Sequence, residues 1–114
     1  MDDCIFCKII AKKIPAKIVY EDEKILAFDD IRPQAPTHTL IITKEHYAAL
    51  PDVPAKKADL IAHIFAVAPR IAESRGIDRT GYRIVLNTGI DAGQDVFHIH
   101  FHLLGGRRMA WPPG

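Results

Sequence analysis

The stretch Phe97-His98-Ile99-His100-Phe101-His102-Leu103-Leu104 alternates between histidine and apolar residues. Strict alternation is typical of a β-strand, in which successive side chains point to opposite faces. The three histidines would then share one face at a spacing of about 7 Å. The opposite face would contribute Phe97, Ile99, Phe101 and Leu103 to the core. Because burying three imidazoles without partners is costly, we expect the histidine face to line a cleft, bind a metal or carry out chemistry.

The segments around this strand predict an α+β fold. Further strands are expected at Val19–Glu21, Ile25–Asp29, Thr39–Thr43 and Tyr82–Asn87. His38 directly precedes the third of these segments. Short turns between successive strands favour an antiparallel sheet of five strands. A short helix is expected within Cys4–Lys13, and a long amphipathic helix from the Pro51–Pro54 segment to Arg75 should cover one apolar sheet face. Pro69 should kink or split the long helix, and Gly76 should end it.

Length and composition predict one soluble domain over residues 1–114. Hydrophobic residues make up 48% and charged residues 25% of the chain, and the net charge is +1. Such a balance argues against bulk binding to nucleic acid or to an anionic membrane. The start, Met1-Asp2-Asp3, is acidic where a signal peptide would be basic, and no apolar run is long enough to span a membrane. We therefore expect a cytoplasmic protein.

The residues alone leave several kinds of site open. Three imidazoles on one face can bind a metal, or one can act as a nucleophile while its neighbours orient it and hold an anion. A His-rich solvated face is the third possibility. The preceding turn could form an anion-binding nest from the backbone amides of Gly93, Gln94 and Asp95. Separately, Cys4 and Cys7 form a C-x-x-C pair, which in a cytosolic protein favours a metal or redox role over a disulfide.

Several motifs together resemble the histidine triad (HIT) superfamily, and within it the Hint branch of histidine triad nucleotide-binding proteins. The central motif is His98-x-His100-x-His102-Leu-Leu, preceded by Gln94-x-Val96-Phe97. The other matching segments are Lys8-Ile9-Ile10, Ile14-Pro15-Ala16-Lys17, Ala27-Phe28-x-Asp30-Ile31, Pro33-Gln34-Ala35-Pro36-Thr37-His38, Gly81-Tyr82-Arg83, Asn87-x-Gly89 and Trp111-Pro112-Pro113-Gly114. The Trp-Pro-Pro-Gly end favours the Hint branch over the dinucleoside polyphosphate hydrolases of the superfamily.

The resemblance implies a purine nucleoside phosphoramidase, which hydrolyses adenosine or guanosine 5′-phosphoramidates to the monophosphate and an amine. His100 would be the nucleophile, forming a nucleotidyl-histidine that water then cleaves. His102 and the turn amides would hold the phosphate oxygens. His38 and His98 would set the tautomer and orientation of His100. No catalytic cofactor is implied.

The resemblance also implies a nucleotide pocket. Asp30 matches the carboxylate that accepts hydrogen bonds from the ribose hydroxyls, and Asn87 matches a residue that braces the phosphate region. The apolar walls around the base would be Phe6, Ile9, Ile14, Phe28 and Ile31. The phosphate turn would comprise Gly93, Gln94, Asp95 and Val96.

Two further expectations concern a metal and a partner. By match with other HIT proteins, a structural zinc would be held by Cys4, Cys7, His46 and His98, a closed Cys2His2 set; reduced, partly buried cysteines are the alternative. The fold would also assemble as a homodimer whose sheet continues across a two-fold axis. Trp111 in the tail would then reach the leaving-group pocket of the partner subunit.

One residue departs from the Hint pattern, which has a serine where this chain has Asp95. A carboxylate beside a phosphate-binding site could repel the substrate. The alternatives to a phosphoramidase are therefore a nucleotide-binding or interaction module with weak turnover and a metallohydrolase with zinc on the three histidines. A dinucleoside polyphosphate hydrolase is a further, less favoured enzyme alternative.

Overall fold

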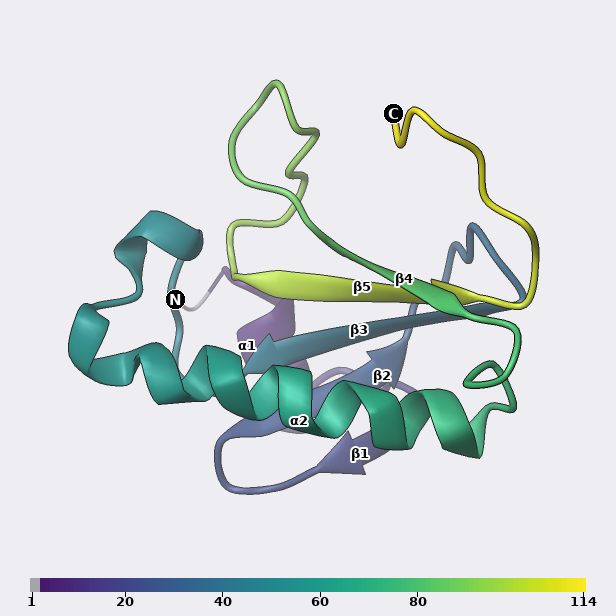
Figure 1. The fold of residues 1–114 in the computed structure, drawn as a ribbon. Helices are drawn as coiled ribbons and strands as arrows, with labels where there is room; N and C mark the ends of the chain where they lie inside the picture. The colour runs from purple at the N-terminus through teal and green to yellow at the C-terminus, as the bar shows by residue number, and fades with distance from the viewer. Residues whose placement is uncertain (1–2) are drawn as a thin grey trace.

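A five-stranded antiparallel sheet in the order β1-β2-β3-β5-β4 forms the centre of the described part of the chain (Figure 1). The computed structural model describes residues 3–114; Met1 and Asp2, which begin the acidic start of the sequence, lie outside the described residues. The strands are β1 Ile18–Glu21, β2 Ile25–Asp29, β3 Thr37–Thr43, β4 Tyr82–Leu86 and β5 His100–Gly105. The α+β class and the five-stranded antiparallel sheet are confirmed.

The histidine strand is shorter than its alternation predicts. β5 begins at His100, which pairs with Ile42 of β3, so Phe97 and His98 precede the strand. The chain leaves the sheet before that point, because the Ile99 amide donates to the carbonyl of Tyr47 at 2.7 Å. Phe97 is consequently 61% exposed, and its prediction as a core residue was wrong. Its expected companions in the core, Ile99, Phe101 and Leu103, are buried.

Helices cover both faces of the sheet, whereas the sequence predicted only one covered face. The long helix α2, Ala58–Ser74, packs on one face and the short helix α1, Ile5–Ile10, on the other (Figure 1). Strand β2, whose first four residues are buried, shows both contacts, since Ile25 and Ala27 join the α2 cluster while Leu26 joins the α1 cluster. The histidines of β5 point to the α1 face, because the intervening Phe101 packs in the α2 cluster.

Pro69 lies inside α2 without splitting it, contrary to one of the two expected effects. A proline removes a hydrogen bond to the carbonyl four residues earlier, here that of Phe65, and both residues lie on the exposed side of the helix, where water can satisfy that carbonyl. Two short 3-10 turns, Leu50–Asp52 and Ala55–Lys57, lead into α2. Gly76 follows its end with φ 72°, as a left-handed helix terminus requires.

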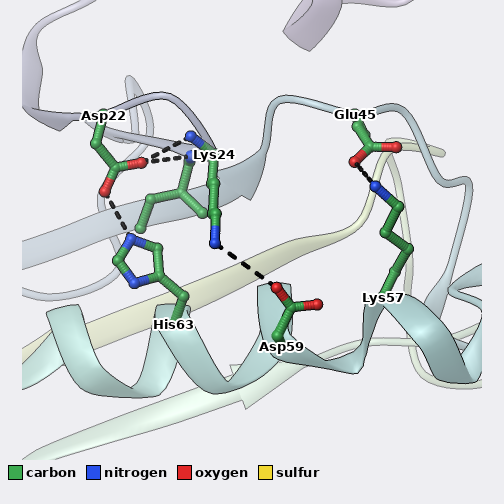
Figure 2. A network of polar contacts seen from close by, with 7 residues as sticks. Asp22, Lys24, Glu45, Lys57, Asp59 and His63 are labelled. Carbon is green, nitrogen blue, oxygen red and sulfur yellow. Dashed lines mark hydrogen bonds and ion pairs between the residues drawn. The ribbon is translucent and has the colours of Figure 1, made fainter.

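Polar contacts fasten α2 to the loops on its side of the sheet (Figure 2). His63 Nε2 lies 2.6 Å from Asp22 Oδ2 in the turn between β1 and β2, and the Tyr20 hydroxyl donates to the same oxygen at 2.7 Å. Ion pairs join Lys24 to Asp59 and Lys57 to Glu45. His63, which the sequence places on the long helix between apolar positions and which would be interpreted there as a solvated residue, is therefore hydrogen-bonded. No helix in residues 3–114 has both the length and the apolarity to cross a membrane.

Candidate functional site

His100 and His102 stand side by side on the α1 face of β5. The register places His100 opposite Ile42 and His102 opposite Leu40 and Val85, so apolar strand residues surround the two rings. Their ring centroids are 5.0 Å apart, and His100 is only 3% exposed. The alternation that predicted a shared face is thus realised for these two histidines, which lie at the start and in the middle of the strand.

A chain of hydrogen bonds fixes the proton positions on His38 and His102. The Gln34 amide donates to His38 Nδ1 at 3.0 Å, so the proton of a neutral His38 is on Nε2. His38 Nε2 lies 2.8 Å from His102 Nδ1 and donates to it. The proton of His102 is therefore on Nε2, a buried atom with no hydrogen-bond partner in residues 3–114. A buried donor without a partner is costly, so this N–H is suited to a ligand acceptor.

Burial keeps these two rings neutral. Desolvation lowers the pKa of His102 to about 4, with repulsion from His100 and His38 acting in the same direction. Desolvation also lowers the pKa of His38, although the nearby Asp30 carboxylate opposes the shift. The ring of His38 thus orients His102 rather than His100, which differs from the expected arrangement.

His100 is oriented by the backbone of His98. Its Nδ1 donates to the His98 carbonyl at 2.8 Å, which leaves the lone pair on Nε2. The Phe6 ring packs nearly perpendicular to the His100 ring, with centroids 5.2 Å apart. Asp95 Oδ1 lies 3.6 Å from His100 Nε2, and the Asp95 side chain is 81% exposed. A buried imidazole held in this orientation has the geometry of a nucleophile.

A cavity of about 290 Å³ opens beside these two rings, between α1 and the sheet. The apolar residues that the sequence predicted as base walls all line it: Phe6, Ile9, Ile14, Phe28 and Ile31. Asp30 lies at the same cavity, where its Oδ1 accepts from the Arg32 amide at 2.9 Å and its Oδ2 is 3.5 Å from His38 Nε2. Asp95 and Val96 complete the lining near His100. An apolar slot with a few polar groups at one end is the usual form of a small-ligand site.

Gln94 stabilises the loop before β5 through its side chain. This structural role differs from the expected one, in which its backbone amide belongs to an anion-binding nest. Gln94 is buried, and its side chain accepts from the Gly89 amide and donates to the carbonyls of Ala48 and Val96. The amides of Gly93 and Gln94 are also occupied, because they donate to carbonyls within the loop. Two of the three expected nest amides are therefore unavailable. Within residues 3–114, the amides of Asp95 and Val96 donate to no protein acceptor, and both residues line the cavity.

His98 belongs to a different cluster from its two companions. Its Nε2 donates to the Thr43 carbonyl at 2.7 Å, and burial lowers its pKa to about 4, so its Nδ1 carries a lone pair. That nitrogen lies 3.1 Å from His46 Nδ1, 3.4 Å from Cys4 Sγ and 3.6 Å from Cys7 Sγ. All four side chains thus present one donor atom to a common point. This is a soft Cys2His2 donor set of the kind that closes around zinc, and the Thr43 carbonyl fixes the ligand tautomer. Within residues 3–114 the ligand atoms of His98, His100 and His102 form no such group, because His98 turns Nδ1 to the sulfurs, and this argues against a zinc ion shared among the three.

Some residues at the site carried no signal in the sequence. Asn87 does not line the first cavity but a second one, together with Arg83 and Arg107. Arg83 belongs to the matching Gly81-Tyr82-Arg83 segment, but no role was predicted for it or for Arg107, because a lone arginine in a strand or tail resembles any surface cation. Trp111 is 81% exposed and lines neither cavity within this single chain.

The comparisons with known proteins agree with this geometry. The sequence model of the HIT domain matches residues 11–109. The "14 kDa zinc-binding protein" of Zea mays is 50% identical over 112 residues, covering 96% of this chain and 87% of that protein. A solved HIT family hydrolase from Legionella pneumophila Philadelphia 1 is 54% identical, with a TM-score of 0.95 and coverage of 98% of this chain and 100% of that one. A histidine triad nucleotide-binding protein from Candida albicans is 36% identical, with a TM-score of 0.84 and coverage of 96% and 83%. The chain therefore belongs to the HIT domain family.

Proposed function

We propose that this protein is a purine nucleoside phosphoramidase of the Hint branch, with His100 as its nucleophile. The observation that carries the proposal is the pairing of two nitrogens: the lone pair of His100 Nε2 and the unpartnered N–H of His102 Nε2 at one cavity. Phosphoryl transfer requires both groups: a nitrogen lone pair to attack phosphorus and an N–H donor to stabilise the phosphoryl oxygens. The nucleotide-binding name of the Candida albicans protein supports a nucleotide as the ligand.

The reaction proceeds in two displacements at phosphorus. His100 Nε2 attacks the α-phosphorus, the P–N bond breaks, and the amine leaves with a proton from solvent. Water then attacks the nucleotidyl-histidine, the P–N bond to His100 breaks, and a proton returns to solvent. The sum is hydrolysis to a nucleoside monophosphate and an amine. His102 Nε2 and the amides of Asp95 and Val96 donate to the phosphoryl oxygens in both steps.

The first cavity receives the nucleoside in this proposal. The base lies between Phe6, Ile9, Ile14, Phe28 and Ile31, and the Asp30 carboxylate accepts from the ribose hydroxyls. Asp30 Oδ1 already accepts one amide hydrogen, but a carboxylate has about four acceptor positions, so the ribose can share it. Adenosine and guanosine monophosphates are the expected product ligands.

Steady-state hydrolysis of a panel of adenosine and guanosine phosphoramidates tests the activity. A phosphoramidase releases the amine and the monophosphate with first-order dependence on active protein. Asp95, 3.6 Å from His100 Nε2, favours one alternative, a nucleotide-binding module with weak turnover. Tight binding of the monophosphate without amine release would support that alternative and reject the enzyme.

We also propose a structural zinc held by Cys4, Cys7, His46 and His98. The fit rests on the donor chemistry and on the Thr43 carbonyl that leaves His98 Nδ1 as the donor. The maize relative is called a zinc-binding protein, which supports the same assignment. When bound, the ion would cross-link the N-terminal segment to the loops around His46 and His98. Elemental analysis of protein purified without added metal should give one zinc per chain.

Finally, we propose that residues 1–114 form one domain that assembles as a homodimer. β4 lies at a sheet edge, and an unpaired edge strand offers free amides and carbonyls to a second copy. The two copies would pair through β4 and extend the sheet, with Trp111 of each tail reaching the leaving-group side of the other site. A dimer mass by light scattering at micromolar concentration is expected; a monomer would contradict it.

A further inference from the structure

A second cavity of about 270 Å³ adjoins the first and shares His102 with it. The β4–β5 register explains its position, because Val85 lies opposite His102 and Arg83 lies opposite Leu104 on this end of the sheet. The tail after β5 forms another part of its wall and rises on the same side of the sheet as the loop between β4 and β5 (Figure 1). The nucleoside cavity lies over β2 and β3 instead. His102 is thus the triad histidine at which the two cavities meet.

The charge of the second cavity is positive. Arg83 and Arg107 both line it, and no acidic side chain of residues 3–114 does. Arg83 donates to the Ala110 carbonyl at 3.0 Å, and Arg107 donates to the carbonyls of Gln34 and Arg108. All three acceptors are neutral, and none of the ion pairs within residues 3–114 includes either arginine. Because guanidinium stays protonated at any physiological pH, two uncompensated charges face this cavity.

Each guanidinium also keeps donors free for a ligand. An arginine has five N–H donors, and Arg83 uses one of them on the protein while Arg107 uses two. The bonds to the tail and to Gln34 hold both side chains in place, so little side-chain entropy is lost when an anion binds. Asn87, in the same lining, adds an uncharged donor and acceptor. Carboxylates and phosphates are the groups that such fixed guanidinium pairs recognise.

We propose that the second cavity receives the amine leaving group and that Arg83 and Arg107 select amines that carry a carboxylate. This inference rests on the proposed phosphoramidase function, since it assigns the substituent on the far side of phosphorus from the nucleoside. The substrate class is then a purine nucleoside phosphoramidate of an acidic amine, such as an amino acid linked through its amino group. Asp95 lines the nucleoside cavity and not this one.

Three matched adenosine 5′-phosphoramidates test the selection. Their amines are the α-amides of glutamate, glutamine and lysine, which are anionic, neutral and cationic but similar in size. We expect kcat/KM to fall in that order, with the glutamate conjugate about five- to tenfold above the glutamine conjugate, since hydrogen bonds between charged groups are stronger than neutral ones. Arg83→Gln should remove most of this ratio and Arg83→Lys should retain part of it. Arg79→Gln, an exposed arginine outside both cavities, is the matched control and should keep the ratio.

A binding measurement separates this inference from the proposed activity. Calorimetric affinities of the glutamate and glutamine conjugates for the His100→Ala protein should differ in the same direction, and Arg83→Gln in that background should abolish the difference. If wild type hydrolyses none of the conjugates, the phosphoramidase proposal fails, but the affinity difference still decides the role of the cavity. Equal affinities, or a difference that survives Arg83→Gln, would overturn the selection by the arginines.

Discussion

His98 and His102 flank His100 in the sequence at equal distance, yet their surroundings differ. His98 uses Nε2 on the Thr43 carbonyl and turns Nδ1 to two sulfurs and His46. His102 accepts from His38 on Nδ1 and keeps an unpartnered N–H on Nε2. Burial lowers the pKa of both rings to about 4, so their charge state does not distinguish them. The tautomer does: one ring offers a lone pair to a soft donor cluster, and the other offers a proton to a cavity.

The difference arises from where β5 begins. Residues of β5 are hydrogen-bonded to β3 and β4 on either side. His98 lies before the strand and can turn toward the N-terminal segment. The His-x-His-x-His motif thus contributes to two sites. His100 belongs to the cavity, while His98, whose carbonyl accepts from His100, belongs to the Cys2His2 donor cluster. Substitutions in the cavity should therefore affect turnover, whereas substitutions in the donor cluster should affect metal content and stability.

The largest expected effect is the loss of turnover in His100→Ala. Without an imidazole at this position no nucleotidyl intermediate forms, while the cavity walls remain. Monophosphate affinity should stay within about tenfold, or 1.4 kcal/mol, by calorimetry. His63→Ala removes a histidine outside the site and serves as the control. Near-normal hydrolysis by pure His100→Ala protein would remove His100 as the nucleophile.

On the metal side, Cys4→Ser should lower stability more than it lowers the chemical step. Loss of a ligand weakens a structural zinc site, and metal-binding free energy contributes directly to folding. We expect a melting temperature lower by at least about 4–8 °C, which corresponds to about 1 kcal/mol for a domain of this size. The rate of single-turnover amine release, measured below the melting range, should change by a smaller free-energy equivalent than the stability does. Equal zinc content and stability in Cys4→Ser and wild type would favour the reduced-cysteine alternative.

Zinc retention should also depend on pH in a defined direction. Burial and the neighbouring Cys4 raise the pKa of Cys7 to about 11 in the metal-free chain, so protons compete with the ion for this sulfur. Zinc should stay bound at neutral pH and be released as the pH falls, with a higher release midpoint in Cys4→Ser. Dialysis followed by elemental analysis at each pH measures this. Retention that does not vary with pH would argue against thiolate ligands.

On the cavity side, the expected effect of Asp95 is smaller. Repulsion between its carboxylate and the substrate phosphate should cost about 1 kcal/mol at 6–7 Å with an effective dielectric near 50, and less in salt. Asp95→Ser should raise kcat/KM about fivefold for a neutral amine conjugate, and Asp95→Asn should recover part of the gain. For a lysine ester conjugate the gain should shrink or reverse. If Asp95→Ser is slower on both substrates, the carboxylate has a positive catalytic role.

The smallest effect is expected at a histidine that belongs to neither site. Burial alone would raise the pKa of Asp22, but hydrogen bonds from His63, Tyr20 and the turn amides lower it well below its usual range. A carboxylate whose pKa is lower in the folded than in the unfolded state stabilises the fold above the unfolded pKa of about 4 and loses that contribution as the pH falls. His63→Ala should cost about 1 kcal/mol or less at pH 7.

Urea unfolding at pH 7 and pH 3 measures that effect. The acid-induced loss of stability should be smaller in His63→Ala and in Asp22→Asn than in wild type. Hydrolysis of the phosphoramidates should be unaffected by either change, because both residues lie on the α2 side of the sheet (Figure 2). An unchanged pH dependence in both variants would show that the contact between Asp22 and His63 has no part in acid stability.

Local pattern predicted the elements of the fold well, because apolar spacing and turn residues act within a few positions. β2 matched its predicted bounds, Ile25–Asp29. The start of β5 was missed because a contact remote in sequence, between the Ile99 amide and Tyr47, draws the chain out of the sheet. Alternation cannot report such a contact. The same departure exposes Phe97 and separates His98 from the other two histidines.

For the candidate site, the sequence predicted the residues that lie in recognisable local motifs and missed those brought together by the fold. The apolar walls and Asp30 were named from motif resemblance, and the structure brings them together at one cavity. The role of Gln94 was not predictable, since its amide could face a ligand or, as observed, close the loop. Arg83 and Arg107 lie far apart in sequence and meet only because β4 and the tail share one end of the sheet. Residues that assemble through topology leave no local signature.

The helix α1 links the two regions energetically. It is only six residues long, too short to be stable alone, and it carries Cys7 of the donor cluster as well as Phe6 and Ile9 of the nucleoside cavity. Any occupant that fixes this helix lowers the entropic cost for the other. By thermodynamic linkage, zinc should strengthen nucleotide affinity by the same factor by which nucleotide strengthens zinc affinity. In the proposed function, the short N-terminal helix therefore couples zinc binding to nucleotide binding within a single chain.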